Sequence, residues 1–163
     1  MQDIVRLKDP RPPVLIDAMP TNAALNQLLI DLGRSLLQYV GESWPWTAST
    51  SSARQTLEKL VAQQQKSVAA LAEMLSERAV PIDFGSYPTE YTDLQYLSLQ
   101  FLLGELVRGG AEDVASVKST IDECRSDAEA ASLLEAILKS QTKILDELKT
   151  LQASATAGAT IVV

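Results

Sequence analysis

The chain has 163 residues, of which 46% are hydrophobic, and this composition supports one buried core in a single domain. Its formal charge is -7, with 14 basic residues scattered among 21 acidic ones, which argues against binding to nucleic acid or to an anionic membrane. Histidine is absent, so the usual general base near neutral pH, the His-dependent nucleophile pairs and the commonest transition-metal ligand are excluded.

Residues 1–20 are rich in proline and lack helical periodicity, which predicts an extended N-terminal arm. They also lack the basic start and the uninterrupted apolar stretch of a secretory signal. Apolar runs elsewhere are far shorter than the roughly 18 to 20 residues of a membrane span. We therefore expect a cytoplasmic protein with no membrane partner.

The first two helices are predicted from leucine spacing and from capping residues. Leucines recur at steps of three and four residues after an N-cap at Asn22, and Pro45 forbids continuation, which predicts a helix over 22–43. Ser52, followed three residues later by a glutamine, forms a capping box that opens a second helix over 52–78. The next ten residues contain two prolines and a glycine and predict a long connection.

A third helix is predicted over 89–124. Gly109 and Gly110 are typical of a helix end, but the apolar stripe continues through them, so we predict one continuous helix; if they end it, the fold has five helices. Cys124 lies on this stripe and is the only cysteine, so a small buried hydrophobe is the simpler interpretation than a reactive thiol.

A fourth helix is predicted over 126–152, because Ser126 and Glu129 form a second capping box. Residues 153–163 are small and aperiodic and are predicted to form a C-terminal tail. With four amphipathic helices and no strand pattern, the predicted fold is all-α: an antiparallel four-helix bundle over 21–152.

Two glutamines interrupt the apolar stripes of the second and fourth helices. Gln64 follows Leu57 and Val61 at helical spacing, and Gln141 precedes Leu145 in the same way. Each glutamine lies about halfway along its predicted helix. The pattern predicts two buried amides at matching depth in the core.

These features resemble the ferritin-like superfamily, which includes ferritins, bacterioferritins and rubrerythrins. In that family the second and fourth helices each carry Glu-x-x-His and the first and third each carry a Glu, and together these residues hold two iron or manganese ions. The matching stretches are QQKS, residues 64–67, and QTKI, residues 141–144. Gln stands at each Glu position, and Ser67 and Ile144 stand at the His positions. The lone carboxylates would fall among 32–36 and 95–100, where no Glu or Asp lies on the stripe.

The resemblance therefore implies the scaffold without its metal site, and we expect no cofactor and no metal. One interpretation of the glutamines is that they specify the register of packing, in which case leucine at both positions should raise the melting temperature. The alternative is a small-ligand-binding bundle with a central polar pocket. Its candidate residues are Gln64, Ser67, Gln141, Tyr96 and Gln100.

The remaining candidates give no catalytic constellation. Trp44 and Trp46 are a candidate interface, although such residues more often close the end of a bundle. The acidic residues lie mostly off the apolar stripes, as a solvated face requires, and no two of them form a candidate acid/base pair. They include Asp31, Glu112 and Asp113. We expect a non-catalytic structural or protein-interaction module, plausibly a homo-oligomer, with an unidentified protein partner. An enzyme using carboxylate or tyrosine chemistry is a weaker hypothesis.

Overall fold

The computed structural model describes residues 18–44, 51–94 and 97–159, and within them every regular element is helical and no strand is present. The all-α prediction is confirmed. The elements are α1 (Ala18–Gly33), α2 (Leu36–Ser43), α3 (Ser51–Glu77), the 3-10 helix η1 (Thr89–Leu94), α4 (Leu99–Glu123) and α5 (Ala128–Ala159). No helix in these three ranges is both long and apolar enough to cross a membrane.

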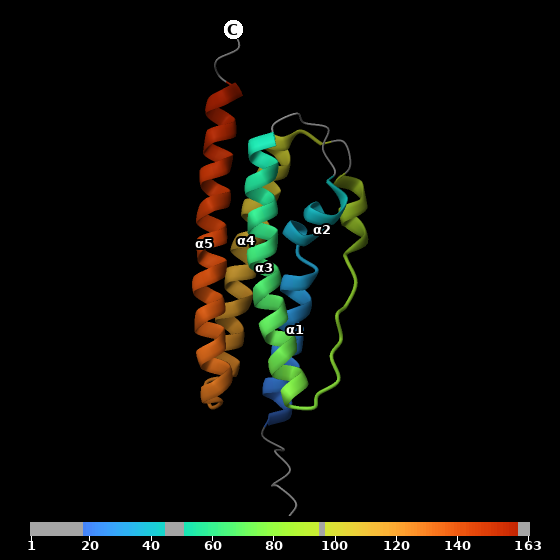
Figure 1. The fold of residues 1–163 in the computed structure, drawn as a ribbon, viewed down its shortest axis with the longest axis vertical. Helices are drawn as coiled ribbons and strands as arrows, with labels where there is room; N and C mark the ends of the chain where they lie inside the picture. The colour runs from blue at the N-terminus through green and yellow to red at the C-terminus, as the bar shows by residue number, and fades with distance from the viewer. Residues whose placement is uncertain (1–17, 45–50, 95–96, 160–163) are drawn as a thin grey trace, which may run out of the picture.

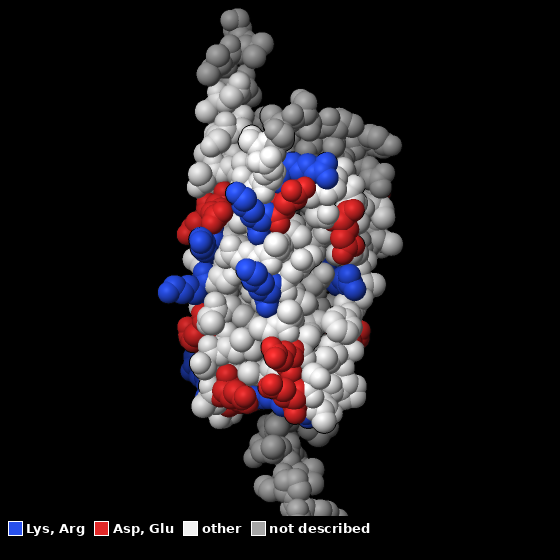
Figure 2. Space-filling model, in the orientation of Figure 1, with Lys and Arg blue, Asp and Glu red and all other residues white. Residues whose placement is uncertain are grey.

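The long helices α1, α3, α4 and α5 lie lengthwise beside one another (Figure 1). The chain rises through α1 and α2, descends through α3, returns along the outer side of α1 through the connection that carries η1, descends through α4 and rises through α5 (Figure 1). α1 contacts α3 and α4, and α5 contacts the same two helices. Basic and acidic side chains are interspersed on the visible face (Figure 2).

The first predicted helix is interrupted, which corrects its assignment as one segment over 22–43. α1 ends at Gly33, and Ser35 has an extended backbone with φ -63° and ψ 160°. The Ser35 hydroxyl accepts a hydrogen bond from the backbone N–H of Gln38, at 3.5 Å, and so caps α2. The same hydroxyl donates to the side-chain oxygen of Gln64, so the helix break directs the Ser35 side chain toward the core.

The third predicted helix also begins later than expected. Residues 89–94 form the 3-10 helix η1, and α4 starts only after Ser98, whose hydroxyl accepts from the N–H of Phe101. The expectation that the helix passes through Gly109 and Gly110 is confirmed. An added Cβ at Gly110 would lie 3.3 Å from Leu145, so the glycine allows α4 and α5 to approach closely.

The last helix differs from its prediction at both ends. Its first turn is capped by Asp127, not Ser126, because the carboxylate accepts from the N–H of Ala130 at 3.0 Å. Asp127 also pairs with Arg78 at 2.7 Å, which ties the end of α3 to the start of α5. α5 continues to Ala159, so most of the predicted tail is helical. Of the predicted arm, residues 18–20 belong to α1 and the rest lies outside the described residues.

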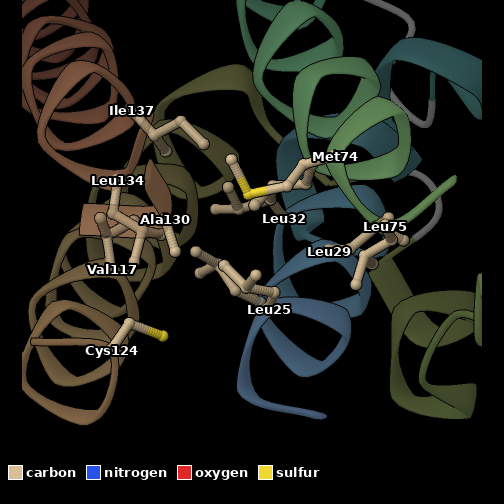
Figure 3. Packing of buried hydrophobic residues seen from close by; sticks show 12 residues of the cluster. Leu25, Leu29, Leu32, Met74, Leu75, Val117, Cys124, Ala130, Leu134 and Ile137 are labelled. Atoms are coloured by element: carbon tan, nitrogen blue, oxygen red, sulfur yellow. The ribbon is translucent and has the colours of Figure 1, made fainter. Parts of the chain in front are cut away.

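Two apolar clusters fill the interior, one toward each end. The Cys124 cluster joins α1, the second half of α3, the second half of α4 and the start of α5 (Figure 3). Cys124 is fully buried there, as predicted. The Val40 cluster joins α2, the first half of α3, the first half of α4 and the second half of α5. Several polar side chains, among them Gln64 and Gln141, are buried with these clusters and belong to neither of them.

Gly41 gives a test of how closely α2 packs on α3. An added Cβ would lie 2.8 and 2.9 Å from the two methyl carbons of Val61, closer than real side chains approach. Overpacking outweighs the gain of helix propensity, so Gly41→Ala should lower the free energy of unfolding by about 1 to 2 kcal/mol. Gly158→Ala is the matched control, since nothing lies within 4 Å of its added Cβ. Chemical denaturation showing equal effects for the two variants would contradict the packing described here.

Candidate functional site

The centre of the candidate site is a direct contact between the two glutamines predicted from the sequence. The Nε2 of Gln64, on α3, donates to the Oε1 of Gln141, on α5, at 3.1 Å. Their exposed fractions are 0% and 2%. The Nε2 of Gln141 donates in turn to the hydroxyl of Ser67, at 3.3 Å. Three of the candidate pocket residues, Gln64, Gln141 and Ser67, are therefore joined by hydrogen bonds.

The two amides belong to a larger hydrogen-bond network, which also includes side chains of α4 and of the region where α1 meets α2. The Oε1 of Gln64 accepts from the hydroxyl of Ser35 at 2.8 Å and from the Nε2 of Gln38 at 3.0 Å, so the α1–α2 junction and α2 contribute one member each. The second N–H of the Gln64 amide donates to the carboxylate of Asp113, on α4, at 2.9 Å. We call these six side chains the polar layer: Ser35, Gln38, Gln64, Ser67, Asp113 and Gln141.

Asp113 corrects the sequence interpretation, which placed it on a solvated face. Burial raises the pKa of this carboxyl from 3.8 to about 7, against the lowering effect of the hydrogen bond from Gln64; the charges of Asp31 and Glu112 raise the pKa further. The sequence contained a signal for this position, since Asp113 lies seven residues after Leu106 and four before Val117.

The polar layer leaves little room and few free polar groups. Among the described residues, no buried side-chain nitrogen or oxygen lacks a hydrogen-bond partner. The cavity between Asp113 and the apolar side chains of Leu37, Leu106 and Ile144 has a volume of about 10 Å³. Such a volume holds about one water molecule. The centre is therefore a nearly closed hydrogen-bonded unit.

The other candidate residues lie elsewhere. Gln100 is exposed at the start of α4 and takes no part in the polar layer, because the helix turns the neighbouring leucines inward in its place. Tyr96 and Trp46 lie outside the described residues. Trp44 is half-buried against the Val40 cluster, with the guanidinium of Arg54 lying 4.5 Å from its ring centroid.

The donor set of the described residues does not favour a metal. No three Cys, Asp or Glu side chains in these ranges lie close enough together to hold an ion. The polar layer itself offers one carboxyl, two hydroxyls and three amides, and each amide already donates to a neighbouring oxygen. Comparison with protein-family models and with curated proteins finds no match. The function is therefore argued from this geometry.

The raised pKa of Asp113 predicts that stability falls as pH rises. The folded state favours the protonated carboxyl, so its contribution is fully present below pH 3.8 and is lost as pH rises through about 7. Between about pH 5 and pH 8 the free energy of unfolding should fall by on the order of 2 kcal/mol. Denaturation at several pH values measures this slope.

Asp113→Asn should remove most of the slope, whereas Asp146→Asn, an exposed change on α5, should leave it intact. Asp127 does not interfere, because Arg78 lowers its pKa and its contribution is lost only at more acidic pH. An unchanged slope in Asp113→Asn would contradict the assignment.

Gln64→Leu should be strongly destabilising. The change removes the amide that bonds the Ser35 hydroxyl, the Asp113 carboxyl and the Gln141 oxygen, and an unpaired buried group costs roughly 1–3 kcal/mol. We expect a loss of about 3 kcal/mol or more in the free energy of unfolding. The sequence-based expectation of a raised melting temperature concerned leucine at both Gln64 and Gln141, and it did not include the hydrogen bonds to Ser35 and Asp113.

Gln65→Leu is the matched control, because Gln65 is exposed on the same helix. Its effect should stay within about 0.5 kcal/mol. Similar denaturation midpoints for the two leucine variants would show that the polar layer contributes little.

Proposed function

We propose that the chain is an antiparallel four-helix bundle of the ferritin-like kind that works without a metal, as a structural or protein-interaction module. The observation that carries this proposal is that the polar layer pairs its own groups around a cavity the size of one water. A centre that is already hydrogen-bonded and filled favours a structural role over chemistry.

The composition of the polar layer supports the ferritin-like part of the proposal. α3 contributes Gln64 and Ser67 at the spacing of the family's Glu-x-x-His, and α5 contributes Gln141 at the corresponding depth. α4 contributes Asp113 and the α1–α2 junction contributes Ser35, so each long element supplies a polar group to one level. In the ferritin-like family all four helices supply ligands for two metal ions, although Asp113 lies outside 95–100, where the resemblance places the carboxylate of this helix.

The chemistry of the same residues supports the absence of a metal. A dinuclear site needs several carboxylates whose repulsion the ions offset. Here Asp113 is the one carboxyl in the layer, and its charge is opposed by burial. Glutamine keeps the shape of glutamate, and its N–H groups hold neighbouring oxygens where a metal would otherwise bind them.

The alternative, a ligand pocket at the glutamines, is less favoured. A volume of about 10 Å³ admits no organic molecule, and binding there would require the helices to separate. In a bundle with a closed centre, binding to a partner takes place on the outer surface. The exposed large apolar side chains of the described residues, Phe84 at 51% and Phe101 at 52%, are candidates for contact with a protein partner or with another copy of the chain.

If the proposal is correct, the protein binds neither iron nor manganese. Full-length protein exposed to Fe²⁺ or Mn²⁺ and then desalted should carry no stoichiometric metal in elemental analysis, and its melting temperature should not change. About two ions per chain would overturn the proposal.

A matched variant tests whether the polar layer lies where related bundles bind metal. Gln64→Glu combined with Gln141→Glu adds two carboxyls to the polar layer, one next to Asp113 and the other next to the first, which should destabilise the protein through like-charge repulsion. Mn²⁺ should raise the melting temperature of this variant and leave the parent chain unaffected. A variant that Mn²⁺ does not stabilise would argue against the ferritin-like equivalence of this layer.

A further inference from the structure

A cleft of about 320 Å³ lies on the outer side of the polar layer, separate from the central cavity. Its walls are the end of α1, the α1–α2 junction, the connection around Tyr91 and the middle of α4. Asp113 lines both the cleft and the central cavity, and Ser35 also belongs to both the cleft and the layer. Asp113 is thus a half-buried carboxyl with access to a space large enough for a small organic molecule.

The charges around the cleft are mostly negative. Three carboxyl groups line it, those of Asp31, Glu112 and Asp113, against one guanidinium, that of Arg34. The Nε of Arg34 donates to the backbone oxygens of Phe84 and Gly85, at 2.9 and 3.2 Å. The guanidinium also lies 4.9 Å from the ring centroid of Tyr87. Arg34 therefore holds the connection in place, and no ion pair in the described part of the chain joins Arg34 to a carboxyl.

The partners of the three carboxyl groups differ. Glu112 forms an exposed ion pair with Arg108 at 3.1 Å. Asp31 accepts from the neutral amide of Gln27 at 2.8 Å. No ion pair in the described part of the chain includes Asp31 or Asp113. Within the described residues, Asp113 therefore has no cation within ion-pair distance.

The walls of the cleft combine apolar and aromatic side chains. Ile30, Leu36 and Pro88 supply apolar surface, and Tyr91 supplies an aromatic ring. Burial raises the pKa of Tyr91, and the charges of Asp113 and Glu112 raise it further, so the phenol lies within the field of these carboxyls. An aromatic ring together with a carboxylate favours an organic cation over an anion or a neutral molecule.

We propose that this cleft binds a small organic cation, an alkylammonium, whose charged nitrogen lies against Asp113 and whose alkyl chain lies along Tyr91 and the apolar wall. A metal ion is disfavoured because no three acidic or sulfur ligands converge in the described residues. The proposal does not depend on the ferritin-like assignment, since it rests on the cleft and its charges.

Binding should be linked to protonation. A cation favours the ionised carboxyl, so binding to Asp113 releases a proton and strengthens as pH rises. The other titratable or charged groups lining the cleft are Asp31, Glu112, Arg34 and Tyr91. Between about pH 8 and pH 6 the apparent Kd should rise by about tenfold, which follows from a folded-state pKa of about 7.

The test is isothermal titration of the full-length protein with n-butylammonium chloride, with sodium butyrate as the matched anion at equal ionic strength. We expect n-butylammonium to bind, butyrate not to bind, and the binding heat near neutral pH to depend on the buffer's ionisation enthalpy because a proton is released. Asp113→Asn should weaken binding by about tenfold or more and remove the proton release. Asp146→Asn removes one exposed acidic charge on α5 and should bind like the parent chain.

Asp113→Asn keeps an oxygen that accepts from Gln64, and it removes a desolvated charge, so the variant is expected to fold. Equal affinity of Asp113→Asn and parent, binding of butyrate, or no binding of n-butylammonium would each overturn the proposal. An alkylammonium also occurs on lysine. Tighter binding of Nα-acetyl-lysine amide than of n-butylammonium would assign the site to a lysine of a partner, and weaker or equal binding would assign it to a free amine.

Discussion

The carboxamide of Gln64 is the group on which the interior depends. Both of its N–H bonds and its oxygen are engaged, to Gln141, Asp113, Ser35 and Gln38, in a place with no exposed surface. A leucine would fill the same space but could not satisfy these neighbours. A glutamate would accept from Ser35 and Gln38 but could not donate to the other two. Glutamine is the residue type that donates and accepts at this crossing point.

Asp113 is the one ionisable group in the otherwise neutral polar layer. The hydrogen bond from Gln64 favours the ionised carboxyl, whereas burial and the charges of Asp31 and Glu112 oppose it, and burial is the largest effect. The one hydrogen bond from the layer comes from a neutral donor, so only part of the desolvation is offset. A cation bound in the adjacent cleft would offset the remaining desolvation cost of the ionised Asp113 carboxyl. Binding in the cleft would therefore change the stability of the interior.

The helices could be predicted from the sequence better than their breaks. Apolar residues recur every three or four positions when one face of a helix is buried. This spacing correctly predicted the helices that contain Gln64 and Gln141 and the continuous helix through Gly110. The break at Ser35 was missed, because the leucine spacing continues across it and the reason for the break lies on another helix, at Gln64. Asp113 was missed for a similar reason: spacing shows that it adjoins a stripe, and only the packing of α4 against α1, α2 and α5 shows that it is half-buried.

The polar layer also explains why the core has two clusters. Leucines of the Cys124 cluster and of the Val40 cluster have similar shapes, so apolar contact alone would tolerate helices shifted along one another by a turn. Such a shift would remove Gln64 from Gln141 and from Asp113 together, and each separated group would be buried without a partner. The layer therefore penalises slipped packings more strongly than the clusters do. Because its members come from the α1–α2 junction, α3, α4 and α5, one set of hydrogen bonds fixes the relative positions of all of them.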